Sequence, residues 1–262
     1  MKDTKAPRVP AVLRGLQILE LLAGHKKRWT NSEVSRKLKI PKSTTSYLLH
    51  TLLASGYLVR EEEGIYRLGM KLLALGGQAL RGIELREVAL PSLRRLTLDT
   101  QTTAHLAVLE GFEAVYIERV PSPGFIQLDT WVGRRMPLHS TSVGKALLAF
   151  LPFAETEEIF RSIGLPRFTP RTISSLPRLK QELQRIRDRG VAVDNEENTP
   201  GVRCIAAPIF GPNGRVLAAL SLTGPVQQIT EERIGMIVEK VKEAAWQLTL
   251  ALGGHAPNPQ AP

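Results

Sequence analysis

The chain has 262 residues, more than one typical domain, and no apolar run approaches the roughly 18 residues that a membrane-spanning helix needs. Cys204 is the only cysteine, which excludes an intrachain disulfide, and the charged N-terminus lacks a secretion signal, so we expect a cytoplasmic, two-domain protein. The net charge of +10 is concentrated in residues 1–60, where twelve basic and three acidic side chains give +9. Such a domain attracts a polyanion, most often nucleic acid, although an anionic membrane surface would also fit.

The first 69 residues predict three helices followed by a hairpin. Apolar residues at helical spacing predict a first helix that stops at Gly24. Thr30 and Glu33 match a capping box, which starts a second helix, and Pro41 suits the first position of a third helix over 41–54. Two strand-like runs, 57–60 and 65–68, are joined by a turn that ends in glycine and predict a hairpin, or wing.

The predicted third helix has an apolar and a polar face. Its apolar stripe, expected to be buried, consists of Leu48, Leu49, Leu52 and Leu53. The polar face is small and basic, and a short polar helix presented after a tight turn can enter a DNA major groove. One of the two threonines at 44 and 45 should instead face inward and pack. The candidate groove residues are Lys42, Ser43, Thr44, Thr45, Ser46 and His50, with phosphate contacts from Lys26, Lys27, Arg28 and Arg67.

After a predicted connector helix over 70–84, the pattern of the chain changes. It predicts a helix over 85–100, strands over 103–109, 114–120 and 125–132, and helices over 143–151, 155–163 and 176–189. Strands near 190–194, 203–210 and 215–223 and a helix over 230–250 follow. This order indicates one antiparallel sheet flanked by helices, in the α+β class. The tail over 253–262 is rich in proline and should be disordered.

Several separated segments resemble one protein family. LKIPKST at 38–44, LLHTL at 48–52, GYL at 56–58 and YRLG at 66–69 resemble the DNA-binding domain of IclR-family regulators. PLHSTSVGKALLA at 137–149, GVRCIAAPIF at 201–210 and AALSLTGP at 218–225 resemble that family's effector domain. The resemblance implies a winged helix-turn-helix over 1–69, a linker helix over 70–84, and a GAF-like antiparallel-sheet effector and oligomerisation domain over 85–252. Tyr47 stands where many relatives carry Arg, so it joins the DNA-binding candidates, where it could stack, donate to a phosphate or simply pack.

The resemblance also places an effector pocket between the sheet and the loop ahead of Gly144-Lys145. Within it, Ser221 and Thr223 lie two apart on a predicted strand and can offer two hydroxyls in one direction, although a solvated sheet face would show the same pattern. Cys204 fits a small buried core residue better than a reactive thiol. Asp194 could orient a ligand hydroxyl, bind a cationic group or start a turn. The implied lining residues are Met136, Ser142, Val143, Asp194, Val202, Cys204, Ser221 and Thr223.

The sequence therefore predicts a transcription regulator, with no membrane partner, that binds a near-palindromic double-stranded operator as a homodimer or homotetramer. Its effector is expected to be a small organic acid or aromatic compound, and no cofactor or metal is expected. Gly144-Lys145 does not match a phosphate-binding loop, because His139 and Ala146 stand where that motif needs a glycine and a hydroxyl residue. The N-terminus of the helix predicted over 143–151 could face an anionic ligand instead. The alternatives are a helical domain with a solvated basic face, an enzyme with a basic DNA- or RNA-binding appendage, and an architectural DNA binder. Effector identity, operator sequence and the choice between repression and activation are left open.

Overall fold

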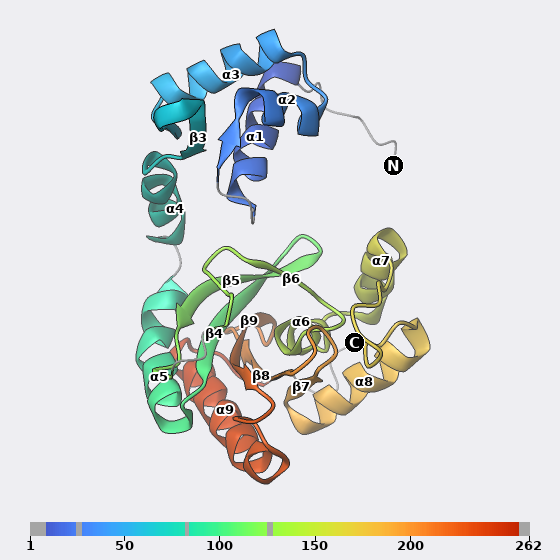
Figure 1. Cartoon of the computed structure of the whole chain (residues 1–262). Helices are drawn as coiled ribbons and strands as arrows, with labels where there is room; N and C mark the ends of the chain where they lie inside the picture. The colour runs from blue at the N-terminus through green and yellow to red at the C-terminus, as the bar shows by residue number, and fades with distance from the viewer. Residues whose placement is uncertain (1–8, 25–27, 82–83, 125–127, 257–262) are drawn as a thin grey trace. The chain divides into compact units, whose positions relative to one another are not determined.

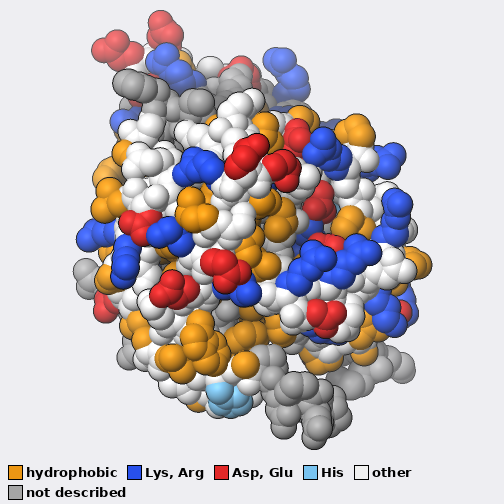
Figure 2. Space-filling model, turned by 90° about the horizontal axis from the view of Figure 1, so that it is seen from below, with side chains coloured by type: hydrophobic (Ala, Val, Ile, Leu, Met, Phe, Trp, Pro, Cys, Tyr) orange, Lys and Arg blue, Asp and Glu red, His pale blue; other side chains and the backbone are white. Residues whose placement is uncertain are grey.

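A computed structural model describes residues 9–24, 28–81, 84–124 and 128–256 (Figure 1). The chain divides into two compact units between residues 82 and 83, and each unit is described by itself. Among the described residues, no helix is both long and apolar enough to cross a membrane. On the face shown in Figure 2, basic and acidic side chains are interspersed, in keeping with the small excess of positive charge outside residues 1–60.

The N-terminal unit contains helices and a small antiparallel sheet with strand order β1-β3-β2. Its core is formed by buried aliphatic side chains of α1, α2, α3 and β2, among them Ile18, Val34, Leu49 and Leu58. The elements are α1 (Pro10–Ala23), β1 (Trp29–Thr30), α2 (Asn31–Leu38), α3 (Lys42–Ala54), β2 (Leu58–Arg60), a short 3-10 turn (Glu62–Gly64), β3 (Ile65–Leu68) and α4 (Lys71–Arg81).

Local signals explain where the helices of this unit begin and end. The predicted capping box is confirmed: Thr30 accepts from the Glu33 amide, and the Glu33 carboxylate accepts from the Thr30 amide at 2.9 Å. Lys39 ends α2 in the left-handed conformation, with φ of 55°. Pro41 is the extended residue that precedes α3 rather than its first helical residue, so the third helix starts one residue later than predicted.

The C-terminal unit is built on one antiparallel sheet with strand order β6-β5-β4-β9-β8-β7. Helices α5 and α9 pack on one face and α6 packs on the other (Figure 1). This arrangement confirms the predicted α+β class. The elements are α5 (Glu84–Thr100), β4 (Thr103–Glu110), β5 (Glu113–Val120), β6 (Arg135–Pro137), α6 (Ser142–Leu148), α7 (Phe153–Ile163), α8 (Leu176–Arg189), β7 (Ala192–Asn195), β8 (Val202–Phe210), β9 (Val216–Pro225) and α9 (Glu231–Ala251).

Two predictions for this unit need correction. Residues 125–127 of the expected strand over 125–132 lie outside the described residues, and residues 128–132 form no strand. Trp131 and Val132 are apolar but largely exposed loop residues, and β6 begins only after the turn at Gly133, where φ is 91°. The tail expected to be disordered starts with an ordered turn, because Gly254 is buried and its amide donates to Thr249 O at 2.7 Å. Residues 257–262 of that tail lie outside the described residues.

Candidate functional site

The exposed face of α3 gathers most of the side chains predicted to bind DNA. Positions three and four apart share one face of a helix, and Ser43, Ser46, Tyr47 and His50 follow that spacing. All four are exposed, as is Lys42 at the start of the helix. Tyr47 is 78% exposed, so it presents its ring and hydroxyl to solvent rather than packing in the core. The helix therefore offers hydroxyl, imidazole and ammonium groups on one accessible surface.

Thr45 is the inward-facing member of the threonine pair. Its side chain is fully buried, and its hydroxyl donates to Pro41 O at 3.1 Å. This confirms that one threonine packs, and it removes Thr45 from the candidate groove residues, whereas Thr44 is half-buried. The predicted apolar stripe is buried only at Leu49, because its other three leucines are half-buried.

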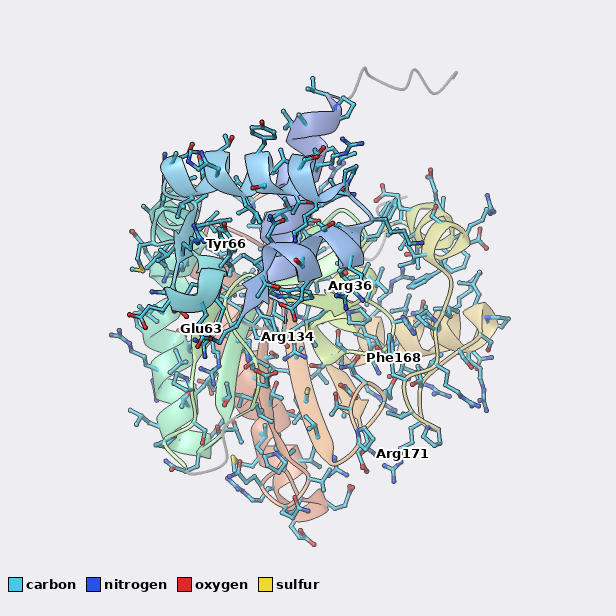
Figure 3. The ribbon with its side chains drawn as sticks, turned by 45° about the horizontal axis from the view of Figure 1, so that its top comes forward. Arg36, Glu63, Tyr66, Arg134, Phe168 and Arg171 are labelled. Atoms are coloured by element: carbon cyan, nitrogen blue, oxygen red, sulfur yellow. The ribbon has the colours of Figure 1, made fainter. Side chains whose placement is uncertain are left out.

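Two predicted phosphate-binding arginines, Arg67 in the wing and Arg28 just before β1, share one carboxylate of the wing. Glu61 accepts from Arg67 Nε at 2.7 Å and from Arg28 Nη2 at 3.3 Å, and both arginines are largely exposed. Ion pairs in this setting contribute little stability in water, so DNA phosphates can compete for the same guanidinium groups. Figure 3 labels Glu63 and Tyr66, which belong to the same hairpin. Lys26 and Lys27, also predicted to contact phosphate, lie outside the described residues.

The residues predicted to bind an effector come together on the α6 face of the C-terminal sheet. Strand pairing places Asp194, Cys204 and Thr223 in one row across β7, β8 and β9. Ser221 lies two positions before Thr223 on β9 and therefore faces the same side of the sheet. These four side chains are buried. The remaining candidates lie at β6, at the start of α6 and at the start of β8: Met136, Ser142 and Val143 are buried, and Val202 is half-buried.

Asp194 holds the turn that follows β7. Its Oδ1 accepts from the amide of Glu197 at 2.7 Å and from that of Asn198 at 3.3 Å. Burial raises the pKa of Asp194 to about 7 in spite of these two bonds, so part of the population carries a protonated carboxyl at neutral pH. Burial also raises the pKa of Cys204, which keeps its thiol protonated and agrees with the core role expected for it.

Lys145 has a structural role that the sequence did not reveal. Its side chain is fully buried, and its Nζ donates to Glu197 Oε1 at 2.5 Å and to Val193 O at 2.6 Å. These bonds tie α6 to β7 and to the turn after it. Gly144 is equally constrained, because a Cβ there would lie 2.5 Å from Leu138 Cα. Gly144 thus allows α6 to approach the Leu138 backbone, and Lys145 links α6 to β7.

Sequence reasoning also missed a stacked aromatic pair beside the predicted pocket residues. His105 on β4 lies opposite Ser221 in the strand pairing, and its ring stacks on Tyr116 of β5 at 4.3 Å. Its Nε2 is 2.9 Å from Thr130 Oγ1. Burial lowers the pKa of His105 to about 3, so the imidazole is neutral. Among the described residues, no group of three or more His, Cys, Asp or Glu side chains is placed to hold a metal ion.

Two family models match this chain. The model described as "IclR helix-turn-helix domain" matches residues 11–62, and the model described as "Bacterial transcriptional regulator IclR C-terminal" matches residues 77–250. The chain is 36% identical over 248 residues to the HTH-type transcriptional regulator XynR of Escherichia coli, which covers 94% of this chain and 98% of that protein.

Solved structures of relatives have the same fold. The IclR structure from Thermotoga maritima has 34% identity and a TM-score of 0.77, covering 92% of this chain and 98% of that one. An IclR homologue from Microbacterium hydrocarbonoxydans, solved in complex with 4-hydroxybenzoate, has 31% identity and a TM-score of 0.79 with the same coverage.

Proposed function

Because the chain belongs to the IclR family of bacterial transcriptional regulators, we propose that it binds operator DNA through the exposed face of α3 and that a small molecule held by the C-terminal unit changes this affinity. The relatives are named as transcriptional regulators and not as enzymes, so the alternative of an enzyme with a basic appendage is rejected. The domain limits proposed for these roles are 1–69, 70–84 and 85–252.

The observation that carries the DNA-binding role is the accessible polar face of α3, together with exposed arginines in the wing and just before β1. Lys42, Ser46 and His50 can reach base edges from a helix lying in the major groove, while Arg28 and Arg67 can reach phosphates. One such unit reads only half of a site. Two copies, and hence a near-palindromic operator bound by a dimer or tetramer, follow from that geometry.

The effector role is supported by the row of buried polar side chains on the α6 face of the sheet. Ser221 carries a buried Oγ with no hydrogen-bond partner among the described residues, and unsatisfied buried polar groups are rare in folded proteins. Asp194 and Thr223 add further hydrogen-bonding groups to the same face. A small organic acid or aromatic compound could occupy this side of the sheet. The Microbacterium homologue was solved in complex with a compound of this class, 4-hydroxybenzoate.

A selection of genomic DNA fragments on the full-length protein tests the DNA-binding role. We expect enrichment of a near-palindromic sequence whose affinity falls steeply with salt, because phosphate contacts release counterions. A screen of small organic acids and aromatic compounds by thermal unfolding then identifies ligands, since a ligand that binds the folded state raises its stability. Each hit should change operator affinity, and operator DNA should change affinity for the hit by the same factor.

The two parts of the proposal fail separately. If no DNA sequence is enriched and binding ignores ionic strength, the DNA-binding role is refuted. If a confirmed ligand leaves operator affinity unchanged, the protein binds DNA without the proposed control, as an architectural DNA binder would.

A further inference from the structure

Three polar groups near the proposed effector site form no hydrogen bond with any described residue. They are the Oγ of Ser221, which is fully buried, and the hydroxyl of Tyr116 and the guanidinium of Arg134. Ser221 and Tyr116 are 1% and 4% exposed, and Arg134 is half-buried. The guanidinium of Arg134 lies over the ring of Trp131, 4.9 Å from its centre, and has no ion-pair partner in the described part of the chain. Of the three, the Oγ of Ser221 is fully shielded from water, and a polar atom buried in this way usually has a partner in the functional state.

Strand pairing and stacking place these groups on the same side of the sheet. Ser221 lies opposite His105, and the ring of His105 stacks on Tyr116. The backbone of Arg134 is bound to the same tyrosine, because Arg134 O accepts from the Tyr116 amide at 3.1 Å. Arg134, labelled in Figure 3, directly precedes β6 and lies two residues before Met136, whose side chain packs under α6.

The positive charge of Arg134 is not neutralised by the carboxylates of the neighbouring strands. Glu110 and Glu113 both pair with Arg135, at 2.7 and 3.2 Å. Glu118 pairs with Arg86 at 2.6 Å. A guanidinium in a partly desolvated position without its own carboxylate is a strong binding group for a planar anion.

The β7 side of the same sheet face carries an acidic group instead of a basic one. Asp194, on β7, can carry a negative charge and would repel an anion placed beside it. Tyr116 lies between the two ends, close enough for Arg134 to lower the pKa of its hydroxyl and for Asp194 and Cys204 to raise it, while burial keeps that pKa high overall. A bound molecule therefore meets a cation at the β6 side, hydroxyl donors between the two sides and a carboxyl group at the β7 side.

We propose that Arg134, at the β6 side of the sheet, binds a carboxylate group of the effector, with Tyr116 of β5 and Ser221 of β9 as hydroxyl donors along the same face. This assignment rests on the proposed effector role of the C-terminal unit. It orients the molecule, with the carboxylate toward Arg134 and an uncharged hydrogen-bond donor, such as a hydroxyl, toward Asp194. Neither the family resemblance nor the predicted pocket residues include Arg134 or Tyr116.

Matched acid and amide probes test the assignment on the full-length protein. The pairs are 4-hydroxybenzoate with 4-hydroxybenzamide and lactate with lactamide, each at about 10 mM in thermal unfolding and then by isothermal titration calorimetry. Each amide keeps the shape of its acid and removes the charge. We expect at least one acid to raise the unfolding midpoint and its amide to bind about 10- to 100-fold more weakly, the loss typical of a charged hydrogen bond.

Variants of adjacent arginines assign the effect to one side chain. Arg134→Gln should weaken acid binding about 10- to 100-fold and leave amide binding nearly unchanged, and Tyr116→Phe should weaken acid binding about 3- to 10-fold. Arg134→Lys, which retains the charge, should recover part of the loss. Arg135→Gln is the matched control, since Arg135 is exposed and paired with Glu110 and Glu113. The unfolding midpoint of each unliganded variant reports whether it has folded.

Three outcomes would overturn the assignment. Stabilisation by an amide but not by its acid would leave the effector role standing and remove the anionic end. Full acid affinity in folded Arg134→Gln, or equal losses in Arg134→Gln and Arg135→Gln, would show that Arg134 is not the binding group. If no acid binds the wild-type protein while DNA binding is intact, the carboxylate class is wrong.

Discussion

Replacing Asp194 by Asn should stabilise the unliganded protein in alkaline solution far more than in acid. Asn keeps an oxygen that can accept the two backbone amides now bound to Oδ1, and it carries no charge. The pKa of Asp194 is raised from 3.8 to about 7, chiefly because burial disfavours the ionised carboxylate. The charge of Glu197 also raises this pKa, whereas the hydrogen bond from the Glu197 amide and the charge of Lys145 lower it. The folded protein therefore holds this proton more tightly than the unfolded chain does.

The sign of the pH dependence follows from that difference. Between the unfolded and folded pKa values, unfolding releases a proton, so stability falls as pH rises through this window. Each pH unit within the window is worth about 1.4 kcal/mol. From about pH 5 to about pH 8, the wild-type protein should therefore lose about 3 kcal/mol of unfolding free energy relative to Asp194→Asn. Above the folded pKa the difference should become constant.

Urea unfolding at several pH values measures this difference directly. Wild type and Asp194→Asn are compared at each pH, so the titration of groups remote from residue 194 cancels. Lys145 and Glu197 face Asp194, and the Asp194 charge raises the pKa of the Cys204 thiol, so the measured difference includes the response of these neighbours. The reasoning would be refuted by two parallel stability curves. That result would mean that the carboxyl titrates near its ordinary pKa and is reached by water in the folded protein.

Three further predictions concern other parts of the chain. Lys42→Ala should weaken operator binding by about 1–3 kcal/mol if the ammonium contacts a base edge. Lys180→Ala, the same change at an exposed position on α8, should leave the Kd for operator DNA unchanged. Equal effects of the two variants in a DNA titration would remove α3 from the interface. Gly144→Ala should lower the free energy of unfolding by about 1–3 kcal/mol, because its Cβ meets the Leu138 backbone at 2.5 Å, and an unaltered urea midpoint would contradict that packing. A fragment of residues 85–252 should unfold cooperatively and bind the effector without measurable operator affinity, which calorimetry and a DNA titration can check. Operator binding by this fragment would contradict the assignment of DNA binding to the N-terminal unit.

Most elements could be predicted because their residues repeat a clear period over a long enough stretch. A missed strand and a wrongly expected strand have local causes. Strand β1, Trp29–Thr30, is too short to show alternation, and it exists because it pairs with β3. The strand expected over 125–132 was suggested by apolar residues such as Trp131, which the structure exposes in a loop.

The site was harder to predict than the fold because it depends on strand order. Strand β9 lies between β4 and β8, so Ser221 faces His105, a residue 116 positions away in the chain. Spacing along one strand could show only that Ser221 and Thr223 share a direction. The sequence predicts that either Thr44 or Thr45 faces the core, and the packing of α3 buries Thr45. The role of Lys145 depends on Glu197, which a separate loop brings to it.

The ion pairs of Arg28 and Arg67 with Glu61 reduce the salt dependence expected for DNA binding. Arg28 and Arg67 already have an anion beside them, the Glu61 carboxylate, before any nucleic acid arrives. A basic side chain that reaches a phosphate displaces a condensed cation from the DNA, and the number displaced sets the slope of affinity against salt. When a wing arginine leaves Glu61 for a phosphate, the abandoned carboxylate attracts a cation from solution and offsets part of that release. The number of phosphate contacts deduced from the slope would then be smaller than the number of basic side chains that touch the DNA.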